Sequence, residues 1–376
     1  MVEWKKLGEI ANLVRGKVIS KDYIRDFEGE YPVYSSQTAN DGVLGSINSY
    51  MFNGDYLTWT TDGAYAGTIF RRKGKFSITN VCGLIDITDS NVHQNFLYFW
   101  LSKTAKNYVL EGMGNPKLMS NVASTILVPI PSLSEQNRIV GILDTFTASI
   151  DNMKEQIALR RKQYEHYRDQ LLDLEGKEGV EMKTLGEVLK SIKTGLNPRK
   201  NFVLNSPGSK NYYITVRELG LYNIIPVEKT DRVTDEALIL INNRSNLEIG
   251  DVLFSGTGTI GRTALVKEKP TNWNIKEGVY TLKPKSNIIE SSYLIQLLHC
   301  KHVIDKISSL IVGDPIKSVP MKNLVIVSIP VPSLQEQQRI VDILDTFEAS
   351  IQNLEAQLSQ REKQYEYYRN KLLTFE

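Results

Sequence analysis

The sequence is poor in cysteine and lacks long apolar runs. Its 376 residues contain two cysteines, Cys82 and Cys300, at unrelated positions, which excludes a disulfide framework and a cysteine-based zinc site. No uninterrupted apolar stretch approaches the roughly 18 residues of a membrane span, and the opening MVEWKKLGEI has no signal-peptide core. We therefore expect a cytoplasmic protein that does not enter a membrane.

A strong charge of one sign is also missing. Lys and Arg number 45 against 43 Asp and Glu, a net charge of +2, which by itself counts mildly against nucleic-acid binding. The balance is uneven along the chain, however. Residues 183–331 contain 20 basic and 13 acidic side chains, whereas residues 332–376 contain 5 and 8. Any contact with phosphate is therefore expected in the globular parts of the chain.

No catalytic set is recognisable. An adenine methyltransferase would need an Asn/Asp-Pro-Pro-Tyr/Phe motif, and the nearest strings, at Asn115 and Asp314, lack the second proline. No carboxylates have a nuclease-like spacing, and the four histidines form no metal-ligand pattern. We predict a chain without activity of its own, without a metal or cofactor, and without a small-molecule substrate.

An internal repeat organises the chain. PIPSLSEQNRIVGILDTFTASI from Pro129 recurs as PVPSLQEQQRIVDILDTFEASI from Pro330, and about 29 of 47 aligned positions are identical when the match is continued. Weaker matches join EWKKLGEI to EMKTLGEV, and GDYLTWTTDGAYAGT to GDVLFSGTGTIGRT. The chain is a duplication of a variable globular domain and a similar tail. We place the globular domains at 1–131 and 183–331, and the tails with their linker at 132–182 and 332–376.

Each tail is predicted to be a helix of roughly 40 residues, about 60 Å long. Ser132 with Glu135, and Ser333 with Glu336, form capping boxes after Pro-x-Pro segments. Apolar residues then alternate in steps of four and three, which is typical of a coiled coil. These seam residues are Ile139, Leu143, Phe146, Ile150, Met153, Ile157, Tyr164, Tyr167 and Leu171, and in the second tail Ile340, Leu344, Phe347, Ile351, Leu354, Leu358, Tyr365, Tyr368 and Leu372.

Such a seam on its own favours a dimerisation helix. Here it has a partner of equal length inside the chain, so we predict antiparallel pairing of the two tails with an approximate two-fold axis. The globular parts carry short β-type runs followed by helical stretches. The predicted fold class is therefore α+β, with two similar domains separated by an intramolecular antiparallel coiled coil.

A glycine-rich loop in the second half has the formal pattern G-x-G-x-x-G at Gly256, Gly258 and Gly261. A dinucleotide-binding fingerprint would open a helix within a βαβ unit, whereas RTALVKEKP after this loop reads as a strand and a turn. We interpret residues 256–263, and 63–68 in the first half, as loops between strands. A loop that approaches DNA and a purely structural turn both remain open.

Polar and basic residues of the variable domains are the candidates for DNA contact, because Gln and Arg suit base edges while Lys, Ser and Thr suit phosphates. In the first half they are Ser35, Ser36, Gln37, Thr38, Thr60, Thr61, Asp62, Tyr65, Arg71, Arg72 and Lys117. In the second half they are Lys193, Thr194, Arg217, Ser255, Thr257, Thr259, Arg262 and Lys317.

Over essentially its whole length the chain resembles the specificity subunit of type I restriction-modification systems. The resemblance is carried by the duplicated Pro-x-Pro-Ser-Leu-x-Glu-Gln-x-Arg-Ile, the helix ends QYEHYR and QYEYYR, and the LGE openings at Leu7 and Leu185. It implies two target-recognition domains, each of which reads half of a split asymmetric site on double-stranded DNA. It also implies docking of two adenine-methylating modification subunits, and of restriction subunits that supply translocation and cleavage.

Two alternatives remain. The chain could serve a related system in which methylase and nuclease share one polypeptide, and the neighbouring genes would discriminate this case. It could also be a coiled-coil scaffold that binds only proteins, which would give no sequence-dependent DNA footprint.

Overall fold

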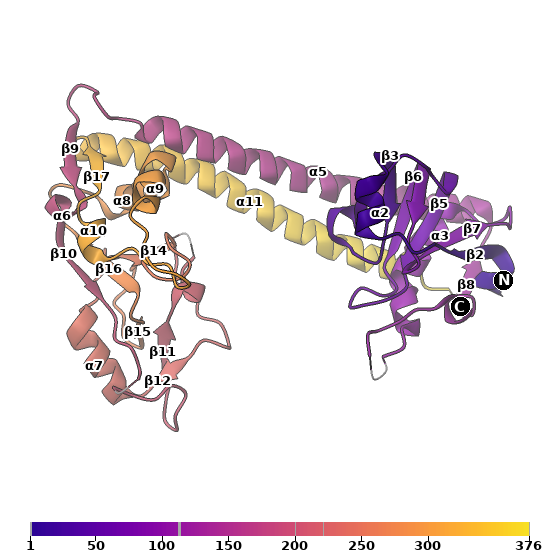
Figure 1. The fold of residues 1–376 in the computed structure, drawn as a ribbon, viewed down its shortest axis with the longest axis horizontal. Helices are drawn as coiled ribbons and strands as arrows, with labels where there is room; N and C mark the ends of the chain where they lie inside the picture. Colours follow the sequence, from indigo (N-terminus) through magenta and orange to yellow (C-terminus); the bar gives the residue numbers. More distant parts are fainter. Residues whose placement is uncertain (1, 112–113, 200, 221, 376) are drawn as a thin grey trace. The chain divides into compact units, whose positions relative to one another are not determined.

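The computed structural model describes residues 2–111, 114–199, 201–220 and 222–375. The chain divides into two compact units, Met1–Lys154 with Ala356–Glu376, and Glu155–Glu355. Each unit contains one globular domain and part of both long helices, α5 (Leu133–Leu172) and α11 (Leu334–Leu372) (Figure 1). Within the described ranges, none of the helices combines the length and apolar character needed to cross a membrane.

The first unit is built on a six-stranded sheet in the order β2-β7-β5-β6-β3-β4, beside a two-stranded pairing of β1 with β8. Its strands are β1 (Glu3–Lys6), β2 (Ala11–Arg15), β3 (Glu28–Tyr34), β4 (Val43–Ile47), β5 (Phe52–Thr60), β6 (Ile69–Ile78), β7 (Cys82–Ile87) and β8 (Leu127–Ile130). Its short helices are α1 (Leu7–Ile10), α2 (Lys21–Asp26), η1 (Ala39–Gly42), α3 (Gln94–Thr104), η2 (Ala105–Tyr108) and α4 (Ser120–Ala123).

The second unit has a four-stranded sheet, β10-β16-β13-β14, a three-stranded sheet, β12-β11-β15, and a pairing of β9 with β17. Its strands are β9 (Glu181–Thr184), β10 (Leu189–Thr194), β11 (Asn211–Ile214), β12 (Arg232–Val233), β13 (Val252–Ser255), β14 (Thr263–Leu265), β15 (Trp273–Ile275), β16 (Val279–Pro284) and β17 (Ser328–Val331). Its short helices are α6 (Leu185–Val188), η3 (Val216–Glu218), α7 (Asp235–Ser245), α8 (Ser291–His299), α9 (Lys301–Ser308) and α10 (Met321–Leu324).

The two domains share a common sheet core. The antiparallel order β2-β7-β5-β6 of the first unit matches β10-β16-β13-β14 of the second. The strands added to this core differ, because β3 extends the first sheet in parallel with β6, whereas β11 belongs to a separate sheet in which it runs parallel to β15. The domains are therefore alike in this four-stranded core and differ in how the strands outside it are arranged.

The repeated tail motif fastens each long helix to its own domain. Ser132 Oγ accepts from Glu135 N at 3.3 Å, which is one of the two hydrogen bonds of the predicted capping box. The Glu135 carboxylate pairs with Arg138 instead. Gln136, which is fully buried, donates to the carbonyls of Asn91 and Pro131 and accepts from the His93 backbone N–H.

The second tail repeats this attachment. Gln337 is fully buried, donates to the carbonyls of Ile288 and Pro332, and accepts from the Glu290 backbone N–H. The glutamine of the motif thus joins the start of the tail to the segment before α3 in one domain and before α8 in the other.

The predicted seam is the packed face of both helices. Ile139, Leu143, Ile340 and Leu344 are completely buried. In the first unit, Phe146 of α5 stacks on Tyr368 near the end of α11, with ring centroids 5.3 Å apart.

The second unit contains the counterpart of this contact. Tyr167 and Phe347 also have ring centroids 5.3 Å apart. Early residues of α5 meet late residues of α11 and the reverse, so the segments pair antiparallel within each unit, as predicted. The exposed faces of Tyr167 and Tyr368 mark the seam positions nearest to solvent.

Candidate nucleic-acid interface

The two predicted glycine loops are hairpin loops of the same construction. The loop after β5 is closed by Gly67 N donating to Thr60 O at 2.8 Å, and the loop after β13 by Gly261 N donating to Ser255 O at 3.0 Å. The hydroxyl groups at these strand ends form hydrogen bonds within the loops. Thr60 Oγ1 accepts from Thr68 N at 3.0 Å, and Ser255 Oγ accepts from Arg262 N at 2.8 Å.

Both loops are also tied to the same later segment of their domains. Gly63 N donates to Pro116 O at 3.0 Å, and Gly258 N donates to Lys317 O at 2.9 Å. The candidates Lys117 and Lys317 therefore lie beside the loops, and both are exposed. The weak sequence similarity between the two loops thus corresponds to the same place within each domain's own fold.

Each glycine of the formal G-x-G-x-x-G pattern has a structural reason. A Cβ at Gly256 would lie 2.1 Å from the Tyr280 ring, while Gly258 and Gly261 have φ of +79° and +91°, a region that favours glycine. The loop is followed by strand β14 and not by a helix. It thus lacks the strand–loop–helix context of a dinucleotide site.

In the first domain, six of the predicted residues share one groove of about 490 Å³ between the segment after β3 and the loop after β5. They are Ser35, Ser36, Gln37, Thr38, Asp62 and Tyr65. Tyr65 is 57% exposed, and Asp62 Oδ1 is shielded from solvent without a hydrogen-bond partner among the described residues. Asp62 as a whole is only partly buried, and a carboxylate can accept from the amino group of a base.

Two predicted readers of the first domain lie elsewhere. The Arg71 guanidinium sits 4.2 Å from the Tyr98 ring centroid, and its Nη2 is 2.9 Å from Asp144 Oδ1 on α5. Arg72 is 2% exposed and lies 3.6 Å from the Tyr34 ring centroid. The structure corrects the prediction for Arg72, which belongs to the packed interior. Arg71 is exposed and joins the domain to the long helix, and its contact with DNA stays a prediction.

Buried hydroxyl groups require the same correction. Thr60, Thr61 and Ser255 are completely buried, so they cannot contact a base edge while the loops keep this conformation. Thr194 is 6% exposed, and its hydroxyl donates to Val279 O at 3.1 Å. These residues shape the loops and strand ends that border the grooves.

In the second domain, a groove of about 760 Å³ lies where β10, β13 and β15 end and where η3 follows β11. It is lined by the predicted Thr194, Arg217 and Thr257. Three basic residues that sequence reasoning missed line it too, namely Arg199, Arg244 and Lys276. Four basic side chains face two acidic ones, Asp231 and Glu277, so the groove is suited to a polyanion.

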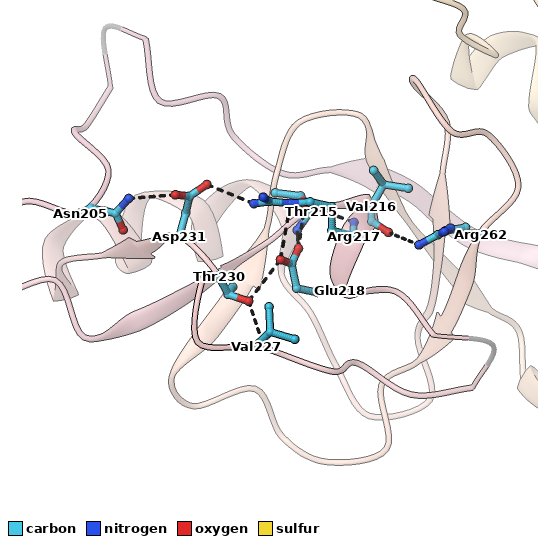
Figure 2. A network of polar contacts seen from close by, with 9 residues as sticks. All are labelled: Asn205, Thr215, Val216, Arg217, Glu218, Val227, Thr230, Asp231 and Arg262. Atoms are coloured by element: carbon cyan, nitrogen blue, oxygen red, sulfur yellow. Dashed lines mark hydrogen bonds and ion pairs between the residues drawn. The ribbon is translucent and has the colours of Figure 1, made fainter. Parts of the chain in front are cut away.

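The remaining candidates of the second domain are not among the residues that line this groove. Thr259 and Arg262 are exposed on the hairpin loop, and Lys193 is half-buried on β10. Arg262 Nη1 donates to Val216 O at 3.3 Å, which places this arginine as a support for η3 (Figure 2).

The histidines and cysteines lie apart from both grooves. His299 Nε2 is 2.7 Å from Thr263 Oγ1, and burial lowers the pKa of this histidine to about 4, with Arg168 contributing. Cys300 Sγ is 2.8 Å from His302 Nδ1, and burial raises the pKa of the Cys300 thiol to about 11. Among the residues that the structure describes, no three His, Cys, Asp or Glu side chains are grouped as metal ligands.

Comparison with known proteins identifies the domain type. The family model described as the type I restriction modification DNA specificity domain matches residues 1–159 and 177–362. A Mycoplasma pneumoniae protein named as a type I specificity subunit is 30% identical over 98% of this chain and 96% of its own length. The EcoR124I/EcoR124II specificity subunit of Escherichia coli is 29% identical over 100% of this chain and 94% of its own length.

Solved structures share the fold. The type I S subunit from M. genitalium matches with a TM-score of 0.58 at 17% identity, over 100% of this chain and 97% of that one. A chain from a structure described as showing complex assembly and conformational transition of the type I R-M system matches with a TM-score of 0.63 at 19% identity, over 99% and 96%. With its family model matched twice along its length, the chain belongs to the type I restriction-modification specificity subunits.

Proposed function

We propose that the chain recognises a split, asymmetric site on double-stranded DNA, with one half read by each globular domain. In this proposal residues 1–131 and 183–331 are the two readers, and residues 132–182 and 332–376 are the spacer helices with their linker. The observation that carries it is that the hairpin loops after β5 and β13 have the same construction, whereas the grooves beside them are lined by different side chains. The first groove offers hydroxyl, amide and carboxylate groups, whereas the second offers four basic side chains.

The different walls suit different base sequences. Carboxylate and amide groups pair with the amino groups of cytosine and adenine, whereas arginine pairs with guanine. Because the hairpin loops are built alike, each domain would present its groove to DNA in the same manner. The different side chains that line the two grooves would then determine which bases each domain accepts. An asymmetric target follows from two unlike readers.

The partners belong to the same proposal. The tails leave polar faces rich in Glu, Gln, Lys and Arg outside the seam, and these faces suit docking of two modification subunits, one for each repeat. The modification subunits would carry the methyl donor and methylate adenine, and restriction subunits would add translocation and cleavage. The chain itself would contribute recognition without catalysis, in the cytoplasm where the host DNA is modified.

A protein-only scaffold is the competing function, and one experiment separates the two. The chain is expressed with its cognate modification subunit in a methylation-free host, and the methylated bases of the genome are sequenced. We expect methylated adenines within one two-part motif. Methylation without a common motif, despite an assembled complex, would contradict the proposal and favour the scaffold.

A further inference from the structure

Arg217 occupies a special position in the second groove. It belongs to η3, directly after β11, and its side chain is 60% exposed along the groove wall. Its neighbours in the wall, Arg199, Arg244 and Lys276, come from three other segments of the domain. A polar network surrounds the guanidinium and the backbone of Arg217 (Figure 2).

The guanidinium is held on one side by a fixed acceptor. Nη2 of Arg217 lies 3.5 Å from Asp231 Oδ2, and Nε lies 3.4 Å from Thr215 Oγ1. Asp231 is itself oriented, because Asn205 Nδ2 donates to its Oδ1 at 2.8 Å. Asn205 in turn accepts from Arg232 N at 2.8 Å, so the chain of contacts ends on the backbone next to Asp231.

The backbone beneath Arg217 is fixed as well. Glu218 is 1% exposed, and its carboxylate accepts from Thr215 N at 2.8 Å, from Thr215 Oγ1 at 2.7 Å and from Thr230 Oγ1 at 3.2 Å. On the other side Arg262 donates to the carbonyl of Val216 (Figure 2). A short turn is thus pinned from both sides, with an arginine projecting from it.

From this geometry we propose that Arg217 reads a guanine in the half-site of the second domain, and that Asp231 is its positioning residue. The inference rests on the proposed function and deepens it. A bidentate contact with guanine O6 and N7 requires a guanidinium plane of fixed orientation, whereas a phosphate contact requires only charge. The acceptor Asp231 fixes that plane and also offsets part of the charge. Arg199, Arg244 and Lys276 then supply phosphate contacts.

The test uses the full chain assembled with its modification subunits. Once the methylated motif is known, methylation rates are measured on duplexes in which each pair of the second half-site is varied in turn. That half-site is the one retained when residues 1–128 are exchanged. We expect R217A to lose discrimination by about tenfold to a hundredfold at one G·C pair, with the other pairs read as before.

Three further variants separate reading from charge. R217K keeps the positive charge but loses the planar guanidinium that makes the bidentate contact. Discrimination at that pair should therefore be as low as in R217A, while the salt dependence of binding stays as in the wild type. D231N should weaken discrimination at the same pair, because it removes the charged acceptor that orients the guanidinium. K269A removes one positive charge of the same domain outside the groove, and should leave every pair read as in the wild type.

Several results would overturn the inference. It fails if R217A slows methylation of all duplexes equally and lowers the salt dependence, because that is the signature of a phosphate contact. It fails equally if R217A leaves the base profile unchanged, or if the second half-site contains no G·C pair. A wild-type complex without any base preference would overturn the proposed function together with this inference.

Discussion

His299 makes the stability of the second unit dependent on pH. Its ring packs at the end of α8 with Nε2 2.7 Å from Thr263 Oγ1 on β14. Burial, with a smaller contribution from the Arg168 guanidinium, lowers the pKa of His299 from 6.5 to about 4. The folded protein therefore keeps this imidazole neutral at pH values at which the unfolded chain already protonates it.

The magnitude follows from this difference in pKa. Above pH 6.5 the imidazole is neutral in both states, and it makes no pH-dependent contribution. As the pH falls from 6.5 to 4, only the unfolded state gains the proton, so the free energy of unfolding falls by about 3 kcal/mol and levels off below pH 4. At ordinary urea sensitivities this corresponds to a midpoint lowered by about 1 to 2 M.

H299Q supplies the matched variant, because a glutamine amide can still bond to the Thr263 hydroxyl and does not titrate. Urea unfolding of both proteins is followed between pH 7.5 and 4 by hydrogen exchange of peptides from β13 and β16, which report on the same unit. The difference between wild type and H299Q should shrink or reverse by about 3 kcal/mol as the pH falls. Parallel curves for the two proteins would refute the reasoning.

Further predictions concern packing and the tail motif. G256A places a Cβ 2.1 Å from the Tyr280 ring and should destabilise the second unit by about 1–3 kcal/mol. Gly141 lies on α5 with no atom near the added carbon, so G141A should stabilise the first unit by about 0.5–1 kcal/mol. Thermal unfolding measures both, and an equal loss for the two would contradict the contact. Q337L leaves three backbone groups without the hydrogen bonds that Gln337 makes to them, and should lower the free energy of unfolding by about 1–3 kcal/mol. Q338L, on the exposed face of α11, should change it by no more than about 0.5 kcal/mol. Indistinguishable urea midpoints for the two variants would contradict the role assigned to Gln337.

The tails could be predicted closely because their information is local. A cap, a run of turns and a 3.5-residue repeat determine a coiled-coil helix without knowledge of the rest of the chain. The burial of Gln136 and Gln337 was not predicted, because a glutamine one residue after the capping glutamate is usually a surface residue. The presence of a glutamine at the same position in both copies of the motif was the available signal.

The grooves could be predicted only in part because they are assembled by tertiary structure. Arg71 looks like a loop arginine in the sequence, yet α3 brings the Tyr98 ring beneath it. Conversely, Arg199, Arg244 and Lys276 are far apart in the chain, and only the fold brings them to one wall. The residues flanking the glycine loops were found because the repeat marks those loops, whereas their burial depends on contacts that no local pattern encodes.

The division of labour between the two domains is tested most directly by exchanging one of them. Residues 1–128 are replaced by the recognition domain of a related specificity subunit, the hybrid is expressed with the modification subunit, and the methylated motif of the host genome is sequenced. Two independent readers predict a motif with one new half and one retained half. A motif in which both halves change, or the original motif unchanged, would contradict the account.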